Sequence, residues 1–218
     1  MKYSKLITNT ALLAGLALSA VTVAHGEPLK VNITKDVGQV EAVHNGNKVT
    51  IMRNQDEKNT VNPAFALTSR TCPPFCVQPA TLAPGVETVG EVEVLGYIKK
   101  MTDGDKSVLL IDSRTPDWVV RGTIPGSISL PYTKLDDTKG ADPLSVAEAM
   151  ELFGAKETSK GWDFSKAKTL VLFCNGMWCG QSPNNIRTLV KLNYPADKIK
   201  WYRGGMQDWE TLGLTTVK

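Results

Sequence analysis

Two uninterrupted apolar runs constrain the fold of this chain more than any other feature. Residues 108–111 read Val-Leu-Leu-Ile, and residues 170–173 read Leu-Val-Leu-Phe. A strand with one face in water alternates apolar and polar residues. A continuous apolar run is instead typical of a strand buried on both faces, as in a parallel sheet covered by helices. The two runs therefore predict the centre of a parallel sheet.

Helical and shorter strand patterns surround these runs. Three groups of apolar residues recur at helical spacing: Val89, Val92, Leu95 and Ile98; Val146, Ala149, Met150 and Phe153; and Ile186, Leu189 and Val190. Residues 127–130 and 199–202 are typical of further strands, and residues 206–212 of a short last helix. Strands separated by helices predict an α/β fold with an open, mostly parallel sheet flanked by helices.

The first 26 residues are typical of a cleaved secretory signal of the bacterial type. Lys2 and Lys5 precede an uncharged run of apolar and small residues at 11–24, and Ala24-His25-Gly26 offers small residues for a signal peptidase. An uncleaved anchor is the alternative, although the run is short for a membrane span. We therefore expect a periplasmic protein, without a membrane anchor after cleavage.

Signal removal takes away two lysines and lowers the formal net charge from +3 to +1. No basic patch or tract remains that would favour nucleic acid as a partner. His44 is then the one histidine left, which excludes a His-rich zinc site and makes a Cys-His catalytic pair a poor candidate. We expect neither a metal nor a cofactor.

Residues 27–85 form an N-terminal extension of different character. Asn45-Gly46 lies between two alternating runs, which is a strong signal for a β-hairpin because both turn residues tolerate positive φ. Prolines interrupt the segment that follows. One hairpin has too little core to fold alone, so we expect the extension to wrap the domain formed by residues 86–218.

The extension also contains two cysteines, Cys72 and Cys76, with Pro73-Pro74-Phe75 between them. In an oxidising compartment a local disulfide that closes this turn is the leading interpretation. A second interpretation is a Cu(I) site, because the Cys-x-x-x-Cys spacing resembles that of copper-delivery proteins. A third is that the pair lies against the loop after Cys174 and passes electrons or sulfur to it.

The stretch after the second buried run has the layout of a catalytic loop. The strand ends at Cys174, a glycine-bearing loop follows, and Ser182 and Pro183 are predicted as the N-cap and first residue of a helix. Strand, short loop and helix N-terminus direct backbone N–H groups at one point, which lowers the pKa of a thiol placed there. Cys174 is therefore the candidate nucleophile, with a plain core cysteine as the alternative.

With Cys174 placed, residues 86–218 resemble the rhodanese-like (sulfurtransferase) superfamily. Residues 110–114 are similar to that family's strand ending in Asp-x-Arg, and residues 122–128 to its Gly-His-Ile-Pro-Gly-Ala segment, with Thr123 at the histidine position. Residues 174–179 match its six-residue active-site loop. Leu192 and Tyr194 resemble the following helix end, and residues 201–206 with Trp209 and Gly213 resemble its closing pattern.

The resemblance implies a sulfurtransferase in which Cys174 attacks a sulfane sulfur and holds it as a persulfide. Asp112 and Arg114 would support the strand end, and Trp178 would either shape the loop mouth or pack on the extension. The loop amides would stabilise the negative charge. This substrate-binding loop comprises Asn175, Gly176, Met177, Trp178, Cys179 and Gly180. The partners would be a small sulfur-containing donor, a thiol acceptor and a periplasmic protein.

Two departures from the family pattern bear on this function. The loop carries no Arg or Lys, whereas many thiosulfate-using members have basic residues there, so thiosulfate is not fixed as the donor. Cys179 lies inside the loop, where it either resolves the persulfide as a disulfide with Cys174 or faces away. The alternatives are thus a thiol–disulfide redox protein that uses Cys174 and Cys179, and a non-catalytic rhodanese-like binding module.

Overall fold

Five parallel strands form the central sheet of this protein, as the two apolar runs predicted. The structure is a computed structural model and describes residues 29–218, so the predicted signal at 1–26 lies outside the described residues. The strands run in the spatial order β3-β9-β8-β4-β5. Their bounds are β3 Glu87–Val89, β4 Val108–Asp112, β5 Ile128–Ser129, β8 Thr169–Phe173 and β9 Ile199–Tyr202.

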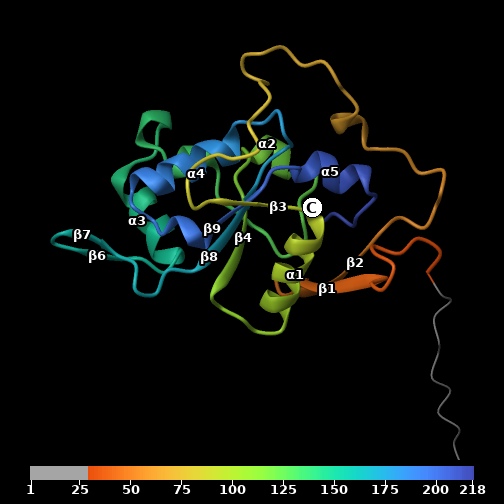
Figure 1. The fold of residues 1–218 in the computed structure, drawn as a ribbon, viewed down its shortest axis with the longest axis horizontal. Helices are drawn as coiled ribbons and strands as arrows, with labels where there is room; N and C mark the ends of the chain where they lie inside the picture. Colours follow the sequence, from red (N-terminus) through yellow and green to blue (C-terminus); the bar gives the residue numbers. More distant parts are fainter. Residues whose placement is uncertain (1–28) are drawn as a thin grey trace, which may run out of the picture.

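Helices cover both faces of the sheet (Figure 1). Helices α1 (Glu91–Thr102) and α5 (Gly205–Thr211) pack on one face, and α3 (Pro143–Leu152) and α4 (Gln181–Lys191) on the other. A short helix, α2 (Pro116–Val119), follows β4, and the hairpin of β6 (Lys156–Thr158) and β7 (Gly161–Asp163) projects from the domain. Four 3₁₀ segments complete the set: Pro63–Phe65, Tyr132–Lys134, Asp137–Lys139 and Ala196–Lys198.

The central strand β8 explains why its sequence has no polar alternation. Val171 and Phe173 belong to the core beneath α1 and α5, while Leu170 and Leu172 belong to the core beneath α3 and α4. All four side chains are buried, because β4 and β9 flank β8 and helices cover both of its faces. The prediction of a two-sided, mostly parallel sheet is confirmed.

The start of the first helix differs from the sequence prediction. Val89 lies in β3, where it pairs with Tyr202 of β9, and α1 begins at Glu91. Val92 is 58% exposed, while Leu95 and Ile98 face the core. Pairing with β9 therefore overrode the helical spacing, since a buried valine at a sheet edge satisfies its backbone through the neighbouring strand. The sequence pattern also did not indicate the β6–β7 hairpin.

The extension wraps the α/β domain, as expected. Its hairpin pairs β1 (Gln39–His44) with β2 (Asn47–Met52), and Asn45 and Gly46 in the turn have φ of 49° and 79°. The hairpin lies against α1, and its Ala42 and Ile51 are buried in the same core as the helix. The chain then runs across the molecule to the side of α2, as Figure 1 shows.

The end of the hairpin is tied to the C-terminal segment. The backbone N–H of Asn54 donates to the carbonyl of Gly213 at 2.6 Å, and the N–H of Thr215 donates to the carbonyl of Met52 at 3.0 Å.

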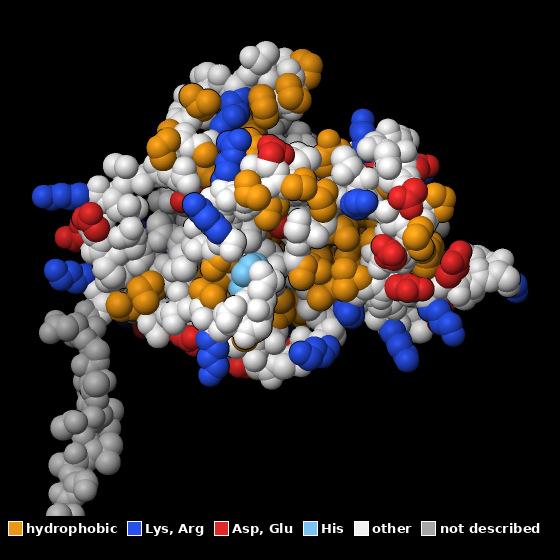
Figure 2. Space-filling view, turned by 180° about the vertical axis from the view of Figure 1, so that it is seen from behind, with side chains coloured by type: hydrophobic (Ala, Val, Ile, Leu, Met, Phe, Trp, Pro, Cys, Tyr) orange, Lys and Arg blue, Asp and Glu red, His pale blue; other side chains and the backbone are white. Residues whose placement is uncertain are grey.

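Figure 2 shows Lys and Arg side chains spread over the face seen from behind, with apolar side chains between them. Among the helices within residues 29–218, none is long and apolar enough to cross a membrane.

Candidate active site

Cys174 is the first residue after β8, at the carboxyl edge of the parallel sheet. Strands β4 and β9 flank β8, so the loops after three strands converge on this point. The cysteine is only 2% exposed, and its carbonyl accepts a hydrogen bond of 2.9 Å from the N–H of Met206 in α5. Sites in open α/β sheets form at this edge because the loops after the strands shape a crevice there.

The surroundings of the Cys174 sulfur favour its thiolate. Burial by itself raises the pKa of a thiol, but the side chain of Cys179, the hydroxyl of Ser182 and the backbone N–H groups of Ser182 and Gly176 outweigh it. Together they lower the pKa of Cys174 to about 7. Hydrogen bonds to the charged form stabilise that form, which is the nucleophile. About half of the chains would therefore hold the thiolate at neutral pH.

Ser182 has a different role from the N-cap that the sequence predicted. Helix α4 begins at Gln181 with Gly180 at the cap position, so Ser182 lies within the first turn and Pro183 follows it there. The Ser182 hydroxyl lies 3.1 Å from the Cys174 sulfur and accepts a bond of 3.2 Å from the indole N–H of Trp201. Sequence reasoning missed the contact between Ser182 and Cys174, because only the folded helix turns the hydroxyl toward the end of β8.

The loop after Cys174 is fixed by backbone hydrogen bonds. The N–H of Cys179 donates to the carbonyl of Gly176 at 2.9 Å, which closes the loop as a turn. The carbonyl of Asn175 accepts from the N–H of Gln207 at 3.0 Å, and the carbonyl of Met177 accepts from the N–H of Gln78 at 2.8 Å. The loop is thus held by α5 on one side and by the extension on the other.

Asp112 and Arg114 support the loop from the end of β4. The Arg114 guanidinium binds both carboxylate oxygens of Asp112, with the shortest contact at 2.6 Å, and both side chains are fully buried. The third nitrogen of Arg114, Nη1, donates to the side-chain oxygen of Asn175 at 3.2 Å. Thr123, at the family's histidine position, donates to Asp112 at 2.7 Å. The ion pair therefore positions the loop without touching the Cys174 sulfur.

Cys179 is buried close to Cys174 rather than exposed to solvent. It is 5% exposed, and its carbonyl lies 3.5 Å from the Cys174 sulfur. Burial raises the pKa of Cys179 well above its ordinary value, and the neighbouring Cys174 raises it further through a hydrogen bond and its charge. Cys179 is therefore a thiol beside a thiolate.

A pocket of about 410 Å³ opens on this loop. Its walls are aromatic or carry amides, and it has one cationic side chain in its lining, that of Lys139. The lining consists of Pro74, Phe75, Trp118, Tyr132, Lys139, Asn175, Trp178, Cys179, Gly180, Gln181 and Asn184. Cys179 thus lines the pocket, whereas Cys174 does not.

Trp178 both shapes this pocket and packs on the extension. Its ring meets Phe75 edge-on at a centroid distance of 5.5 Å, and its indole N–H donates to the side-chain oxygen of Gln207. The guanidinium carbon of Arg70, also from the extension, lies 4.3 Å from the Trp178 ring centre. Arg70 of the extension therefore places a cation next to the loop, whose own sequence contains no Arg or Lys.

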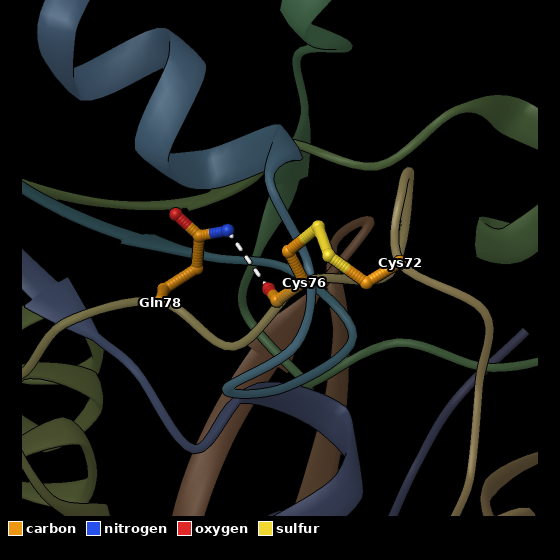
Figure 3. Close-up of a disulfide and its surroundings, with 3 residues drawn as sticks. All are labelled: Cys72, Cys76 and Gln78. Atoms are coloured by element: carbon orange, nitrogen blue, oxygen red, sulfur yellow. Dashed lines mark hydrogen bonds between the residues drawn. A yellow bond between two sulfur atoms is a disulfide. The ribbon is translucent and has the colours of Figure 1, made fainter.

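The two remaining cysteines are joined to each other. Cys72 and Cys76 form a disulfide with Cα atoms 4.7 Å apart, and the side chain of Gln78 donates to the Cys76 carbonyl at 3.0 Å (Figure 3). A disulfide leaves no thiolate to bind copper. The closed turn carries Phe75 against Trp178, so it forms part of the pocket rather than a separate site. His44 lies elsewhere, on the hairpin beside Gly126.

Comparisons with known proteins identify the family. The family profile of the Rhodanese-like domain matches residues 95–212. The chain is 31% identical over 125 residues to a protein of Schizosaccharomyces pombe that carries the name of a mitochondrial thiosulfate sulfurtransferase, and the match covers 56% of this chain and 77% of that relative.

Solved structures give weaker likenesses. The human single-domain sulfurtransferase TSTD1 is 21% identical with a TM-score of 0.36, and the match covers 57% of this chain and 95% of the human chain. SseA of Escherichia coli, a 3-mercaptopyruvate sulfotransferase, is 21% identical with a TM-score of 0.37, and the match covers 56% of this chain and 43% of the SseA chain. The assignment rests on the profile and the yeast relative: the chain belongs to the rhodanese-like family.

Proposed function

We propose that this protein is an exported sulfurtransferase that carries sulfane sulfur as a persulfide on Cys174. The observation that carries the proposal is the buried Cys174 sulfur, whose pKa of about 7 is set by donors from the loop and from the first turn of α4. A plain core cysteine has no such donors and keeps a raised pKa. The reactive thiol also argues against a non-catalytic binding module.

The reaction has two steps. In the first, the Cys174 thiolate attacks the outer sulfur of a donor R–S–SH, which forms Cys174–S–SH and releases the thiolate R–S⁻. In the second, an acceptor thiolate or cyanide attacks the outer sulfur and restores the Cys174 thiolate. The N–H groups of Gly176 and Ser182 and the Ser182 hydroxyl stabilise the negative charge on the sulfur in both steps.

The pocket supports an organic sulfane donor of low charge over thiosulfate. Thiosulfate is a compact dianion, whereas the lining of this pocket is mainly aromatic and amide in character. Lys139 is the one cation in the lining, and Arg70 packs against its aromatic rings. The name of the yeast relative points to thiosulfate. The walls formed by Phe75, Trp118 and Trp178 instead suit the carbon skeleton of an organic persulfide.

The test is sulfur transfer to cyanide. Purified protein is given either glutathione persulfide or thiosulfate with cyanide, and thiocyanate is measured for the wild type and for Cys174→Ser. We expect transfer that needs Cys174 and a larger kcat/KM with the organic persulfide. Transfer that survives in Cys174→Ser would contradict the proposal. A disulfide between Cys174 and Cys179 without thiocyanate would favour a thiol–disulfide redox protein instead.

Export to the periplasm is also part of the proposal. It is supported by the basic and apolar N-terminal sequence and by a disulfide in the extension, a bond typical of oxidising compartments. In a bacterial host that expresses the full chain, we expect the protein in the periplasmic fraction, with a mature N-terminus after Gly26. Recovery of the intact chain from the cytoplasm would contradict this location.

A further inference from the structure

Cys179 has a position that simple sulfur transfer does not use. We propose that it is a resolving thiol, which displaces the sulfane sulfur from Cys174 as sulfide and leaves a Cys174–Cys179 disulfide. This inference rests on the proposed function, because it begins from the Cys174 persulfide. It adds a second activity to the same site: reductive release of the carried sulfur.

The loop geometry brings the two cysteines together. The turn closed by the bond from the N–H of Cys179 to the carbonyl of Gly176 folds the chain back, so that the Cys179 carbonyl lies 3.5 Å from the Cys174 sulfur. Both side chains are buried, at 2% and 5% exposure. Besides burial, the charge of the Cys174 thiolate raises the pKa of Cys179, which is the effect of a like charge nearby.

The two cysteines lie differently with respect to the pocket, which supports different roles for them. Cys179 lines the pocket together with Asn175 and Gly180, whereas Cys174, which is 2% exposed, does not. A sulfur added to Cys174 would reach the pocket past Cys179, the cysteine that lines it. That path places the Cys174–S–SH bond beside the Cys179 thiol, which is where a displacement has to start.

The step balances without an outside oxidant. Cys174–S–SH and Cys179–SH give Cys174–S–S–Cys179 and H₂S, as the Cys179 sulfur attacks the inner sulfur of the persulfide. The Cys179 proton passes to the outer sulfur of the persulfide, so that Cys179 attacks as a thiolate and the outer sulfur leaves as sulfide. The sulfane sulfur is reduced by two electrons, and the two thiols are oxidised to the disulfide.

The cycle is completed by a dithiol reductant of the thiol–disulfide oxidoreductase class. Cys179 is the half of the disulfide that faces the pocket, so an incoming thiolate attacks its sulfur and expels Cys174. Cys174, with a pKa of about 7, is the better leaving group of the two. A thiol of lower pKa leaves faster in thiol–disulfide exchange, so the site is set up for reduction through Cys179.

The test follows the fate of one sulfur without an acceptor. Reduced wild type, Cys179→Ser and Cys179→Ala are each given one equivalent of glutathione persulfide without oxygen. The pH is about 8.5, because loss of Cys179 should raise the pKa of Cys174. Released sulfide is measured, and alkylated protein is mapped by mass. We expect the wild type to release about one sulfide per chain and to show a Cys174–Cys179 link. Both variants should hold the persulfide on Cys174.

Gly96→Ala in α1 is the matched control, because it keeps all four cysteines and lies outside the pocket, and it should release sulfide like the wild type. A mass-mapped link from Cys174 to Cys72 or Cys76 instead of Cys179 would transfer the resolving role to the extension and overturn the proposal. The proposal would also be overturned if the Cys174 persulfide lasted as long in the wild type as in Cys179→Ser, or if the sulfur were found on Cys179. If sulfur reaches Cys174 in none of the proteins, the proposed function itself fails.

Discussion

At the scale of single residues, Cys174 shows how the pKa of a buried thiol can be lowered. Burial raises its pKa, and several hydrogen-bond donors from the loop and α4 act in the opposite direction. The net effect is a pKa of about 7, because donors that point at a sulfur within a dry site interact more strongly than they would in water. The reactivity therefore depends on the donors, not on exposure.

The rate of alkylation of Cys174 should follow this pKa. As the pH rises through about 7 the thiolate fraction grows, so the rate with iodoacetamide should increase about tenfold between pH 6 and pH 8 and then level off. Cys179 should react little, because its pKa is raised and it stays a thiol. Peptide mapping of the alkylated protein at each pH measures both. A midpoint near that of a free cysteine would contradict the assignment.

Ser182→Ala should weaken the thiolate. The variant removes the hydroxyl 3.1 Å from the Cys174 sulfur, so the pKa of Cys174 should rise and its alkylation at neutral pH should slow by about tenfold, the worth of one hydrogen bond to a charged group. Ser113→Ala is the matched control, since the buried Ser113 hydroxyl has no hydrogen-bond partner among the described residues. An equal effect in both variants would argue against a specific role for Ser182.

At the scale of elements, the site depends on how closely α5 approaches the loop after β8. Gly205, the first residue of α5, has a φ of 58°. A Cβ atom added there would lie 2.2 Å from the carbonyl oxygen of Cys174. Only glycine allows this approach, which in turn lets the N–H groups of Met206 and Gln207 bind the carbonyls of Cys174 and Asn175.

Gly205→Ala should therefore destabilise the protein and displace the loop. Positive φ and the clash together should lower the free energy of unfolding by about 2–5 kcal/mol, as measured by urea denaturation. Gly96→Ala in α1 is the control, because a Cβ there meets nothing within 4 Å and alanine favours the helix. A Gly205→Ala protein as stable as the wild type would show that α5 can shift without cost.

At the scale of the whole molecule, the extension completes the pocket. The chain from the hairpin crosses to the loop, where Gln78 binds the Met177 carbonyl and Phe75 and Arg70 pack on Trp178. Arg203, after β9, also donates to the carbonyl of Gln78 at 2.8 Å. Residues far apart in the sequence thus share one wall, and the disulfide fixes the turn that carries Phe75.

The Cys72→Ser/Cys76→Ser variant should lose stability without losing the fold. A disulfide that closes so short a loop restricts the unfolded chain only modestly, so the free energy of unfolding should fall by about 2 kcal/mol. Urea denaturation of oxidised protein measures this difference. Wild type that has been reduced should match the variant, and a difference that persists after reduction would point to an effect of the serines themselves.

The sequence by itself determined the sheet and the family, and it singled out Cys174 as the candidate nucleophile. Residues 108–111 and 170–173 require burial on both faces whatever surrounds them, and the position of Cys174 between a buried strand and a helix follows from local pattern. Local pattern wrongly assigned Val89 to a helix, although it pairs with β9. It also predicted Ser182 as a helix cap, whereas its hydroxyl binds the Cys174 sulfur. Those outcomes depend on contacts with residues distant in the chain.

Only the tertiary structure decided what surrounds the nucleophile. Whether Cys179 faces Cys174 depends on the turn of the loop, and whether a cation lies near the loop depends on Arg70, more than a hundred residues earlier in the chain. Periodicity records which face of an element is buried but not which distant side chain it meets. The choice between a sulfur carrier and a site that also releases sulfide lies in the turn of the loop and in the long-range contacts that hold it.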